Sequence, residues 1–399
     1  MLALPHSFLL LPEESSKAFA HTMRKVHLSA IRFLLSDPFI SISPSLRRKL
    51  QLLRPLLTTI LKKNPHRLIK AMSQQDVLTA IRMIQLNIVN ADRLFPQLIT
   101  SLLINLQTLP EDFLWDQPLE QLIDFPNQRI LHFSPPAIGL SIGPIGISVR
   151  TAERQNIPWT AINTYAIQSH PFHSMTTFCA VSTFDSNPLS MEEAHPDKDG
   201  NQSHLGGKTI LEWQEMLQQA CLLIQETLPE WWNEFPLIMN RFVPVGYHQE
   251  KHLSASYAEA LGLAYISLHP DPLIMAEAII HESQHNKLNA VLWLDPVLHN
   301  AHSEWTSSPV RPDMRPLLGV LLAAHAFVPV AALHARMKEQ QHPFCTNPSF
   351  ARRYTEVLHN NQQAIETLQE KANPTSIGHK ILTGLYQLNH TLQQKKSSY

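Results

Sequence analysis

The segment from Ala276 to His285 constrains this chain more than any other, because it places two histidines four residues apart within an apolar run. Asp271 and Pro272 predict where its helix begins, since Asp suits the N-cap position and Pro suits the first helical position. Side chains four residues apart lie on the same face of a helix. We therefore expect the imidazoles of His281 and His285 to lie one above the other.

Two imidazoles one helical turn apart can bind one divalent metal ion, with Glu282 beside them as a base or a charge partner. The alternative is a histidine pair that decorates a solvated helix face. The body of this helix consists of Leu273, Ile274, Ala276, Ile279 and Ile280. A helix this apolar is expected to be buried, so the sequence predicts a metal site that includes His281 and His285.

The composition excludes several classes of protein. The chain has 399 residues, 44% of them hydrophobic and 16% charged, which is typical of a folded protein with one large core or about two to three domains. The formal net charge of −1 gives no general attraction for nucleic acid or for an acidic membrane. We expect neither as a partner.

The cysteines and the N-terminus predict where the protein resides. Cys179, Cys221 and Cys345 are widely spaced and odd in number, which indicates neither a disulfide framework nor a thiolate metal site. This usage is typical of a reducing compartment. The apolar patch at residues 7–11 is too short for a signal peptide or a membrane span, so we expect a cytoplasmic protein.

The predicted elements divide the chain into three parts. Residues 1–128 form a helical N-terminal region, with apolar side chains at helical spacing from residue 14 to about 107. Residues 129–349 form a mixed α/β metal-site domain around the motif helix, and residues 350–399 form a C-terminal helical segment that packs on it. The predicted fold class is α+β, predominantly helical, with a zincin-like metal-binding helix and a small sheet.

Within the metal-site domain, β-branched and aromatic residues between Pro and Gly predict short strands. These strands cover residues 130–133, 137–150, 164–167, 235–245 and 261–268. A long polar loop is predicted at 185–207, and helices are predicted at about 209–228 and 317–337. The last strand ends just before the motif helix, where metallopeptidases use a strand to hold an extended peptide.

Two segments resemble the centre of a known family. Residues 277–290 surround both histidines, and residues 308–319 have the sequence SPVRPDMRPLLG. Both are similar to the HExxH-motif peptide-modification proteins, which are found with ribosomally made peptide natural products. The similarity covers residues 205–340 and departs from the family at Val310, where members usually carry Trp.

The resemblance implies an iron(II)- and 2-oxoglutarate-dependent oxygenase. Such an enzyme uses O₂ to hydroxylate the β-carbon of a side chain in a ribosomally made precursor peptide. Fe(II) and 2-oxoglutarate are then the cofactors, and the peptide and O₂ are the partners. Two neutral imidazoles suit iron and zinc equally, so the pair alone does not select the metal.

An oxygenase of this kind needs a third protein ligand. His325 is our candidate, because it lies centrally in the second apolar helix, where a lone imidazole is costly to bury. A core histidine bonded to a backbone carbonyl is the alternative. Asp313 and Glu304 are the carboxylate candidates, and either would complete a set of two histidines and one carboxylate.

Arg311 and Arg315 lie around Asp313 in a proline-bounded segment that cannot be helical throughout. A guanidinium offers a planar fork that matches a carboxylate, which is what anchoring the distal carboxylate of 2-oxoglutarate requires. The alternative is an ion pair with Asp313 that pins the loop. We predict that at least one of the two arginines contacts the co-substrate.

Glu282 is the candidate catalytic residue. In a zinc peptidase it would activate water beside the metal, and in an oxygenase it would bond a ligand, the substrate or an arginine. Glu277, one turn before His281, can accept a hydrogen bond from a ligand's second nitrogen. Asn289, one turn after His285, can support the same site. A structural role is the alternative for both.

Three functions of different classes follow. The first is the oxygenase, and the second is a zinc metallopeptidase that processes a peptide, which the motif alone favours and the arginine segment disfavours. The third is a non-catalytic protein that binds a precursor peptide. Retention of His281, Glu282 and His285 together argues against the third, because a lost metal site need not keep them.

Overall fold

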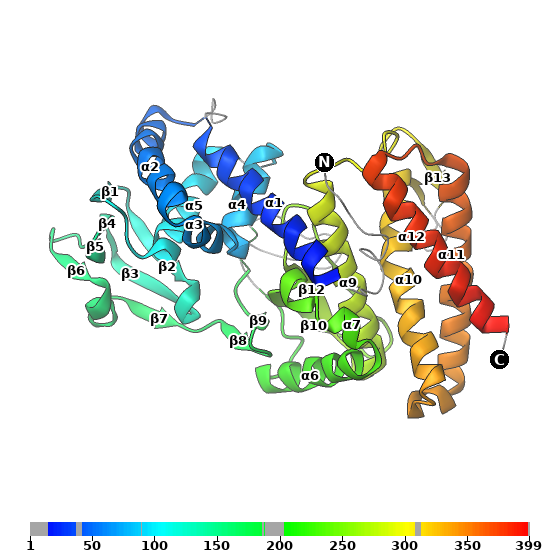
Figure 1. Ribbon diagram of the computed structural model, residues 1–399. Helices are drawn as coiled ribbons and strands as arrows, with labels where there is room; N and C mark the ends of the chain where they lie inside the picture. Colours follow the sequence, from blue (N-terminus) through cyan, green and yellow to red (C-terminus); the bar gives the residue numbers. More distant parts are fainter. Residues whose placement is uncertain are drawn as a thin grey trace. The chain divides into compact units, whose positions relative to one another are not determined.

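The computed structural model describes residues 15–36, 42–88, 90–185, 187, 203–307 and 313–397. Over these residues the protein is mixed α+β, 57% helical, with 12 helices and several small sheets (Figure 1). The predicted class, α+β and predominantly helical, is confirmed at this level. Most of the loop predicted at 185–207 lies outside the described residues.

The described residues belong to two compact units. The N-terminal unit is made of Arg24–His173 and Ser182–Leu189, and the C-terminal unit is made of Met1–Met23, Ser174–Val181 and Ser190–Tyr399. The boundary predicted between residues 128 and 129 lies within the N-terminal unit. There, strand β2 (Leu119–Asp124) turns into strand β3 (Arg129–Ala137), and the two pair antiparallel.

Helices occupy the first part of the N-terminal unit, as predicted. They are α1 (Ser15–Leu35, from Arg24 on), α2 (Pro44–Lys63), α3 (Pro65–Met72), α4 (Gln75–Gln85) and α5 (Ala91–Leu106). Asn64 separates two of them, because it ends α2 while its side chain accepts a hydrogen bond from the backbone N–H of Arg67 at 3.3 Å. Pro65 then takes the first turn of α3, where its missing N–H costs nothing.

Two antiparallel sheets complete the N-terminal unit, in the orders β1-β4-β5-β6 and β2-β3-β7. Their remaining strands are β1 (Phe113–Trp115), β4 (Gly139–Gly143), β5 (Gly146–Arg150), β6 (Asn156–Pro158) and β7 (Ile167–Ser169). The strands predicted at 130–133 and 137–150 are confirmed. The strand predicted at 164–167 is wrong at its start, because a 3-10 helix runs from Trp159 to Thr164 and the Thr164 hydroxyl bonds the Ala161 carbonyl.

A small sheet lies in the C-terminal unit, with β11, β12, β10 and β9 as neighbours in that order. These strands are β9 (Ala180–Ser182), β10 (Arg241–Tyr247), β11 (Ser254–Ala255) and β12 (Leu263–Leu268). β10 runs parallel to β9 and β12, whereas β11 is antiparallel to β12. Every residue of β12 is buried, as a central parallel strand requires.

The strand predicted at 261–268 is confirmed, and the one predicted at 235–245 is only partly right. Its first residues form the short helix α8 (Phe235–Ile238), and β10 begins at Arg241. Pro236 explains the difference, because it suits the first turn of a helix and cannot donate to a strand ladder.

The long helices of the C-terminal unit follow the predicted positions. They are α6 (Ile210–Thr227), α9 (Pro272–Leu292), α10 (Leu317–Glu339), α11 (Pro348–Lys371) and α12 (Ser376–Ser397). The short helix α7 (Pro229–Trp232), between α6 and α8, was not predicted. Asp271 caps α9 as expected, since its carboxylate accepts from the backbone N–H of Leu273 at 2.8 Å. α10, α11 and α12 lie side by side in Figure 1. A hairpin of β13 (Trp305–Ser307) and β14 (Met314–Pro316) precedes α10.

In the described part of the chain, α10 is the one helix long and apolar enough to cross a membrane. Of its most apolar window, 72% is buried inside the protein, which is the burial of a core helix.

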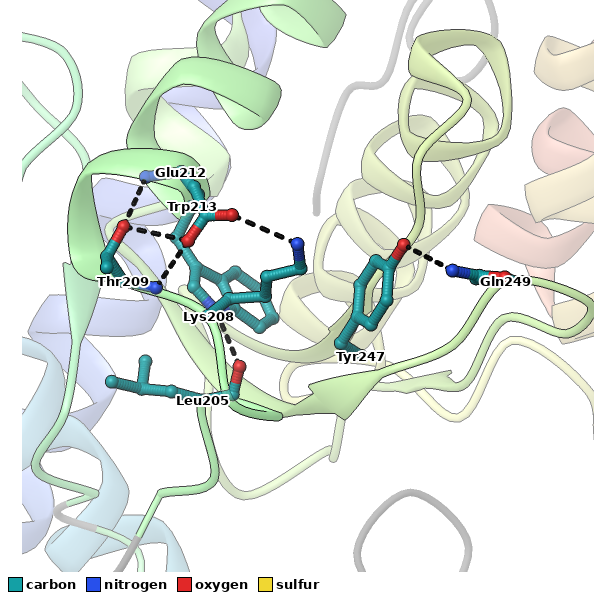
Figure 2. A network of polar contacts seen from close by, with 7 residues as sticks. All are labelled: Leu205, Lys208, Thr209, Glu212, Trp213, Tyr247 and Gln249. Carbon is teal, nitrogen blue, oxygen red and sulfur yellow. Dashed lines mark hydrogen bonds and ion pairs between the residues drawn. The ribbon is translucent and has the colours of Figure 1, made fainter.

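Figure 2 shows how the start of α6 is tied to the end of β10. Thr209 and Glu212 form a capping box, with Glu212 accepting from the Thr209 backbone at 2.8 Å. Lys208 bonds Glu212 at 3.0 Å and lies 4.6 Å from the centre of the Tyr247 ring. Gly206 has φ +67°, and a Cβ there would lie 2.2 Å from the Tyr247 nitrogen, so this approach requires glycine.

Buried polar contacts fix α9 against its neighbours. Glu277 of α9 accepts a hydrogen bond from His334 of α10 at 2.8 Å, and from Arg353 of α11 at 2.9 and 3.0 Å. Burial raises the pKa of Glu277, but the bond from His334 and the charge of Arg353 outweigh it and hold the pKa below its ordinary value. Glu277 is therefore an anion that joins three helices.

A second ion pair anchors the other flank of α9. The ammonium of Lys287 lies 2.5 Å from a carboxylate oxygen of Glu234, and both side chains are fully buried. Burial lowers the pKa of Lys287, while Glu234 opposes that change. A buried charge is costly without its partner, so each residue depends on the other.

We expect Lys287→Met to lower the free energy of unfolding by about 3–5 kcal/mol, because it leaves the Glu234 carboxylate buried and unpaired. The double variant Lys287→Met/Glu234→Leu should recover most of this loss, since it removes both charges. Urea unfolding followed by tryptophan fluorescence measures both. A double variant as unstable as the single one would show that packing, rather than pairing, sets the cost.

Candidate metal and co-substrate site

A cavity of about 540 Å³ in the C-terminal unit brings four elements together. α9 and the chain at 254–258, which begins with β11, supply its polar side, and β14 with α10 supplies Arg315 and most of the apolar side. The residues from α9 are His281, Glu282, His285, Asn289 and Leu292. Those from α10 are Leu318, Gly319, Leu322, Ala323 and Phe327.

The two motif histidines converge at this cavity. Their Nε2 atoms are 2.9 Å apart, and their rings are nearly perpendicular at 87°. One Nε2 can donate a hydrogen bond to the other at this distance. Two nitrogens 2.9 Å apart can also both lie about 2.0–2.1 Å from one ion, the usual metal–imidazole distance. The donor atoms therefore fit a shared metal.

Burial keeps both imidazoles in the form that binds metal. It lowers the pKa of His285 to about 4 and, with the nearby charges of His285, His252 and Arg353, the pKa of His281 well below its ordinary value. Both rings are thus neutral at physiological pH. A neutral imidazole is the ligand form, so the pair needs to lose no proton before it binds an ion.

Glu282 lies beside the pair with 1% of its side chain exposed. Its Oε2 accepts a hydrogen bond from the Ser256 hydroxyl at 2.7 Å, and its Oε1 lies 3.9 Å from Nε2 of His281. The carboxylate is therefore held beside the histidine pair by the chain that follows β11. Sequence analysis missed Ser256, because only the fold brings it to α9.

Arg315 lines the same cavity as the histidine pair. Its Nε also donates to Asp313 at 3.0 Å, and Asp313 is half exposed. The two predicted roles of this arginine, facing the co-substrate position and pairing with Asp313, are thus compatible in one side chain. Arg311 lies outside the described residues.

The other predicted residues lie apart from the pair or have partners of their own. Glu277 directs both carboxylate oxygens to His334 and Arg353. Glu304 pairs with Lys371 at 3.5 Å. Asn289 lines the cavity, whereas Glu304 and Asp313 are absent from the part of its lining that the described residues form.

His325 is fully buried in α10, and it too is absent from the described cavity lining. Neither of its ring nitrogens has a partner within hydrogen-bond geometry, although the backbone of Gln284 is close enough to favour its charged form. Burial, with the positive charge of Lys287, lowers the pKa of His325 to about 3. Its role as third ligand stays a prediction.

In the described ranges, no three His, Cys, Asp or Glu side chains form a group that could hold a metal ion. The described residues therefore bring the two predicted histidine ligands together without a third one beside them. No family model and no curated protein matches this chain.

His325 should make the protein sensitive to mild acid. The folded pKa of about 3 lies below the ordinary 6.5, so the unfolded chain binds the extra proton and stability falls as pH drops below 6.5. From about pH 7 to about pH 5.5 this loss amounts to about 1 kcal/mol per such histidine. In metal-free protein, we expect His325→Gln to reduce the pH-dependent loss of unfolding free energy by that amount.

Urea titrations at both pH values measure the difference. His302→Gln, which replaces an exposed histidine of the same unit, is the matched control. An identical pH dependence for His325→Gln and the wild type would mean that His325 takes up a proton without penalty in the folded state.

Proposed function

We propose that this protein is an iron(II)- and 2-oxoglutarate-dependent oxygenase that hydroxylates the β-carbon of a side chain in a ribosomally made peptide. The observation that carries the proposal is the shared cavity, in which Arg315 and the pair His281 and His285 lie together. The resemblance of residues 277–290 and 308–319 to the peptide-modification family supplies the reaction and the substrate class.

The two imidazoles would hold the iron, and we propose a zincin-like arrangement of α9 beneath the edge strand β11. When bound, iron with 2-oxoglutarate and O₂ supplies the oxidising power for hydroxylation of an unactivated carbon. The balanced reaction converts 2-oxoglutarate, O₂ and a C–H bond into succinate, CO₂ and a C–OH group. Each oxygen atom of O₂ enters one product, succinate or the hydroxylated peptide.

Arg315 would orient the co-substrate. Its guanidinium can form paired, charge-assisted hydrogen bonds with the distal carboxylate of 2-oxoglutarate, while its bond to Asp313 restricts the side chain. The opposite end of 2-oxoglutarate then points toward the histidine pair. Two anchors at opposite ends suit a dicarboxylate better than a neutral peptide bond.

The apolar residues that line the cavity would keep water away from the reaction. Leu318, Leu322 and Phe327 give α10 an apolar face toward the cavity, and Phe327 lies 4.5 Å from the His281 ring between centres. An apolar wall excludes water and strengthens the electrostatic contacts inside. The contact of Ser256 with Glu282 fixes the polar side of the cavity.

A zinc metallopeptidase is the second candidate, and the position of Glu282 favours it. A carboxylate beside two metal-binding imidazoles can accept a proton from a metal-activated water. Arg315 in the same cavity favours the oxygenase, because peptide hydrolysis does not require a carboxylate anchor at that place.

We expect His281→Ala and His285→Ala each to weaken Fe(II) binding by more than about 100-fold, since loss of a direct ligand should exceed the effect of losing a supporting contact. The fold should persist, because neither ring joins α9 to its neighbours through the ion pairs. Anaerobic metal analysis and far-ultraviolet circular dichroism check both points. His302→Ala is the matched control, and iron bound normally by either motif variant would overturn the site.

Wild-type protein with Fe(II) should decarboxylate 2-oxoglutarate and release succinate. Loss of the Arg315 fork should cost about 2–4 kcal/mol of 2-oxoglutarate binding, or roughly 30- to 1000-fold in Kd. We expect this for Arg315→Ala, with partial recovery in Arg315→Lys, because a point charge cannot reproduce the fork. Anaerobic calorimetry of the iron-loaded variants measures it.

Arg311→Ala and Asp313→Asn complete the set, and iron affinity should be unchanged throughout. If the variants of both arginines bind 2-oxoglutarate as the wild type does, the segment is structural. A zinc-loaded wild type that cleaves peptides and ignores 2-oxoglutarate would establish the metallopeptidase instead.

A further inference from the structure

The face of α9 that lines the cavity carries a polar side chain beyond the histidine pair, Asn289. The helix presents His281, His285 and Asn289 to the cavity at intervals of four residues, followed by Leu292. Four residues advance a helix by about 6 Å and return to the same face. Asn289 therefore lies one turn beyond His285, on the same side of the helix.

Two asparagines of α9 are buried, and they differ in their hydrogen bonds. The Oδ1 of Asn286 accepts from the backbone N–H of Gly262 at 2.7 Å. Its Nδ2 donates to the carbonyls of Leu263 and Glu282, both at 3.1 Å. Asn289 is 6% exposed, and its carboxamide forms no hydrogen bond with any residue that the structure describes. A buried amide without a partner is costly, so Asn289 suits a ligand that brings hydrogen-bonding atoms into the cavity.

The packing of α10 on α9 determines what lies opposite Asn289. Glu277, early in α9, accepts a hydrogen bond from His334, which is late in α10. One turn further along α9, the ring of His281 lies 4.5 Å from that of Phe327 between centres. A step forward along α9 is thus a step back along α10, so the two helices run antiparallel.

This register brings Arg315 to the end of the cavity where Asn289 lies. Two further turns along α9 lead from His281 to Asn289, and two turns back along α10 lead from Phe327 to Gly319, which also lines the cavity. Arg315 lies over Gly319, because a Cβ added to that glycine would be 3.5 Å from both Cβ and Cδ of the arginine. Asn289 and Arg315 are therefore at one end of the cavity, beyond the histidine pair.

The two side chains have complementary chemistry for one carboxylate. The guanidinium of Arg315 supplies positive charge and a planar fork of donors. The carboxamide of Asn289 supplies two N–H donors and no charge, so it adds hydrogen bonds without cancelling that of the arginine. A neutral peptide group could satisfy the amide, but it would leave the guanidinium without an anion from the ligand.

We propose that Asn289 binds the distal carboxylate of 2-oxoglutarate together with Arg315, and so selects a dicarboxylate as co-substrate. The inference rests on the proposed function and adds a specificity residue to it. The advance of about 6 Å from His285 to Asn289 suits a five-carbon diacid whose other end lies at the histidine pair. An analogue with a methyl group in that place would leave the amide buried and unpaired, which is how such sites reject analogues.

Two ligands test this role, 2-oxoglutarate and 2-oxopentanoate, which carries a methyl group in place of the distal carboxylate. Anaerobic calorimetry of the Fe(II)-loaded protein measures both affinities. We expect Asn289→Leu to weaken 2-oxoglutarate binding by about 10- to 100-fold, the effect of a hydrogen bond to a charged group. Binding of 2-oxopentanoate should not weaken. Asn289→Asp should lose more 2-oxoglutarate affinity than Asn289→Leu, because two carboxylates repel each other.

Thermal unfolding without metal or ligand separates binding from a structural role. Asn289→Leu should unfold at or above the wild-type midpoint, since it replaces an unpaired buried amide by an apolar group of similar size. Asn360→Leu, the same change on α11 outside the described cavity lining, is the matched control and should leave both affinities unchanged. A lower midpoint for Asn289→Leu, with equal losses of both ligands, would assign Asn289 to the fold and overturn the inference.

The remaining outcomes distinguish this inference from the function on which it rests. Wild-type 2-oxoglutarate affinity in both Asn289 variants, with loss in Arg315→Ala, would overturn the role of Asn289 and leave the proposed function standing. The same unchanged affinity with a raised KM for the peptide would assign Asn289 to the peptide substrate instead. Fe(II)-loaded wild type that binds 2-oxoglutarate no better than 2-oxopentanoate would overturn the proposed function and this inference together.

Discussion

The hydrogen bonds of the buried Glu277 carboxylate fix the helix that carries the candidate site. Glu277 receives hydrogen bonds from His334 and Arg353, so one side chain holds α9, α10 and α11 together. On the other flank, Lys287 and Glu234 form a fully buried pair. Because an unpaired charge would be costly in either place, α9 has one stable position. His281 and His285 are fixed together with α9, since they lie between Glu277 and Lys287 along the helix.

Burial raises the pKa of the carboxyl group of Glu277 and lowers the pKa of the imidazoles of His281 and His285. Glu277 stays charged because hydrogen bonds and a guanidinium compensate it, whereas His281 and His285 stay neutral because burial disfavours their protonation. The same helix therefore carries an anion that holds the fold and two neutral rings that can bind a cation. If the proposed metal ion binds, it would accept the lone pairs of the two rings without displacing a structural charge.

Sequence analysis identified what is encoded locally and missed what depends on distant partners. Asp271 and the apolar spacing after it predicted α9, because capping and periodicity are local properties. The partners of Glu277 are 57 and 76 residues away, so its structural role was not visible in the sequence. Ser256 was missed for the same reason, since only the pairing of β11 with β12 brings its chain to α9.

The chain after β11 connects the edge of the sheet to α9 at the cavity. β11 has two residues, and among the described strands it pairs with β12. On the side of α9, the hydroxyl of Ser256 donates a hydrogen bond to the carboxylate of Glu282 at 2.7 Å. The chain at 254–258 lines the cavity, so this bond determines where the polar wall of the cavity lies relative to the histidine pair.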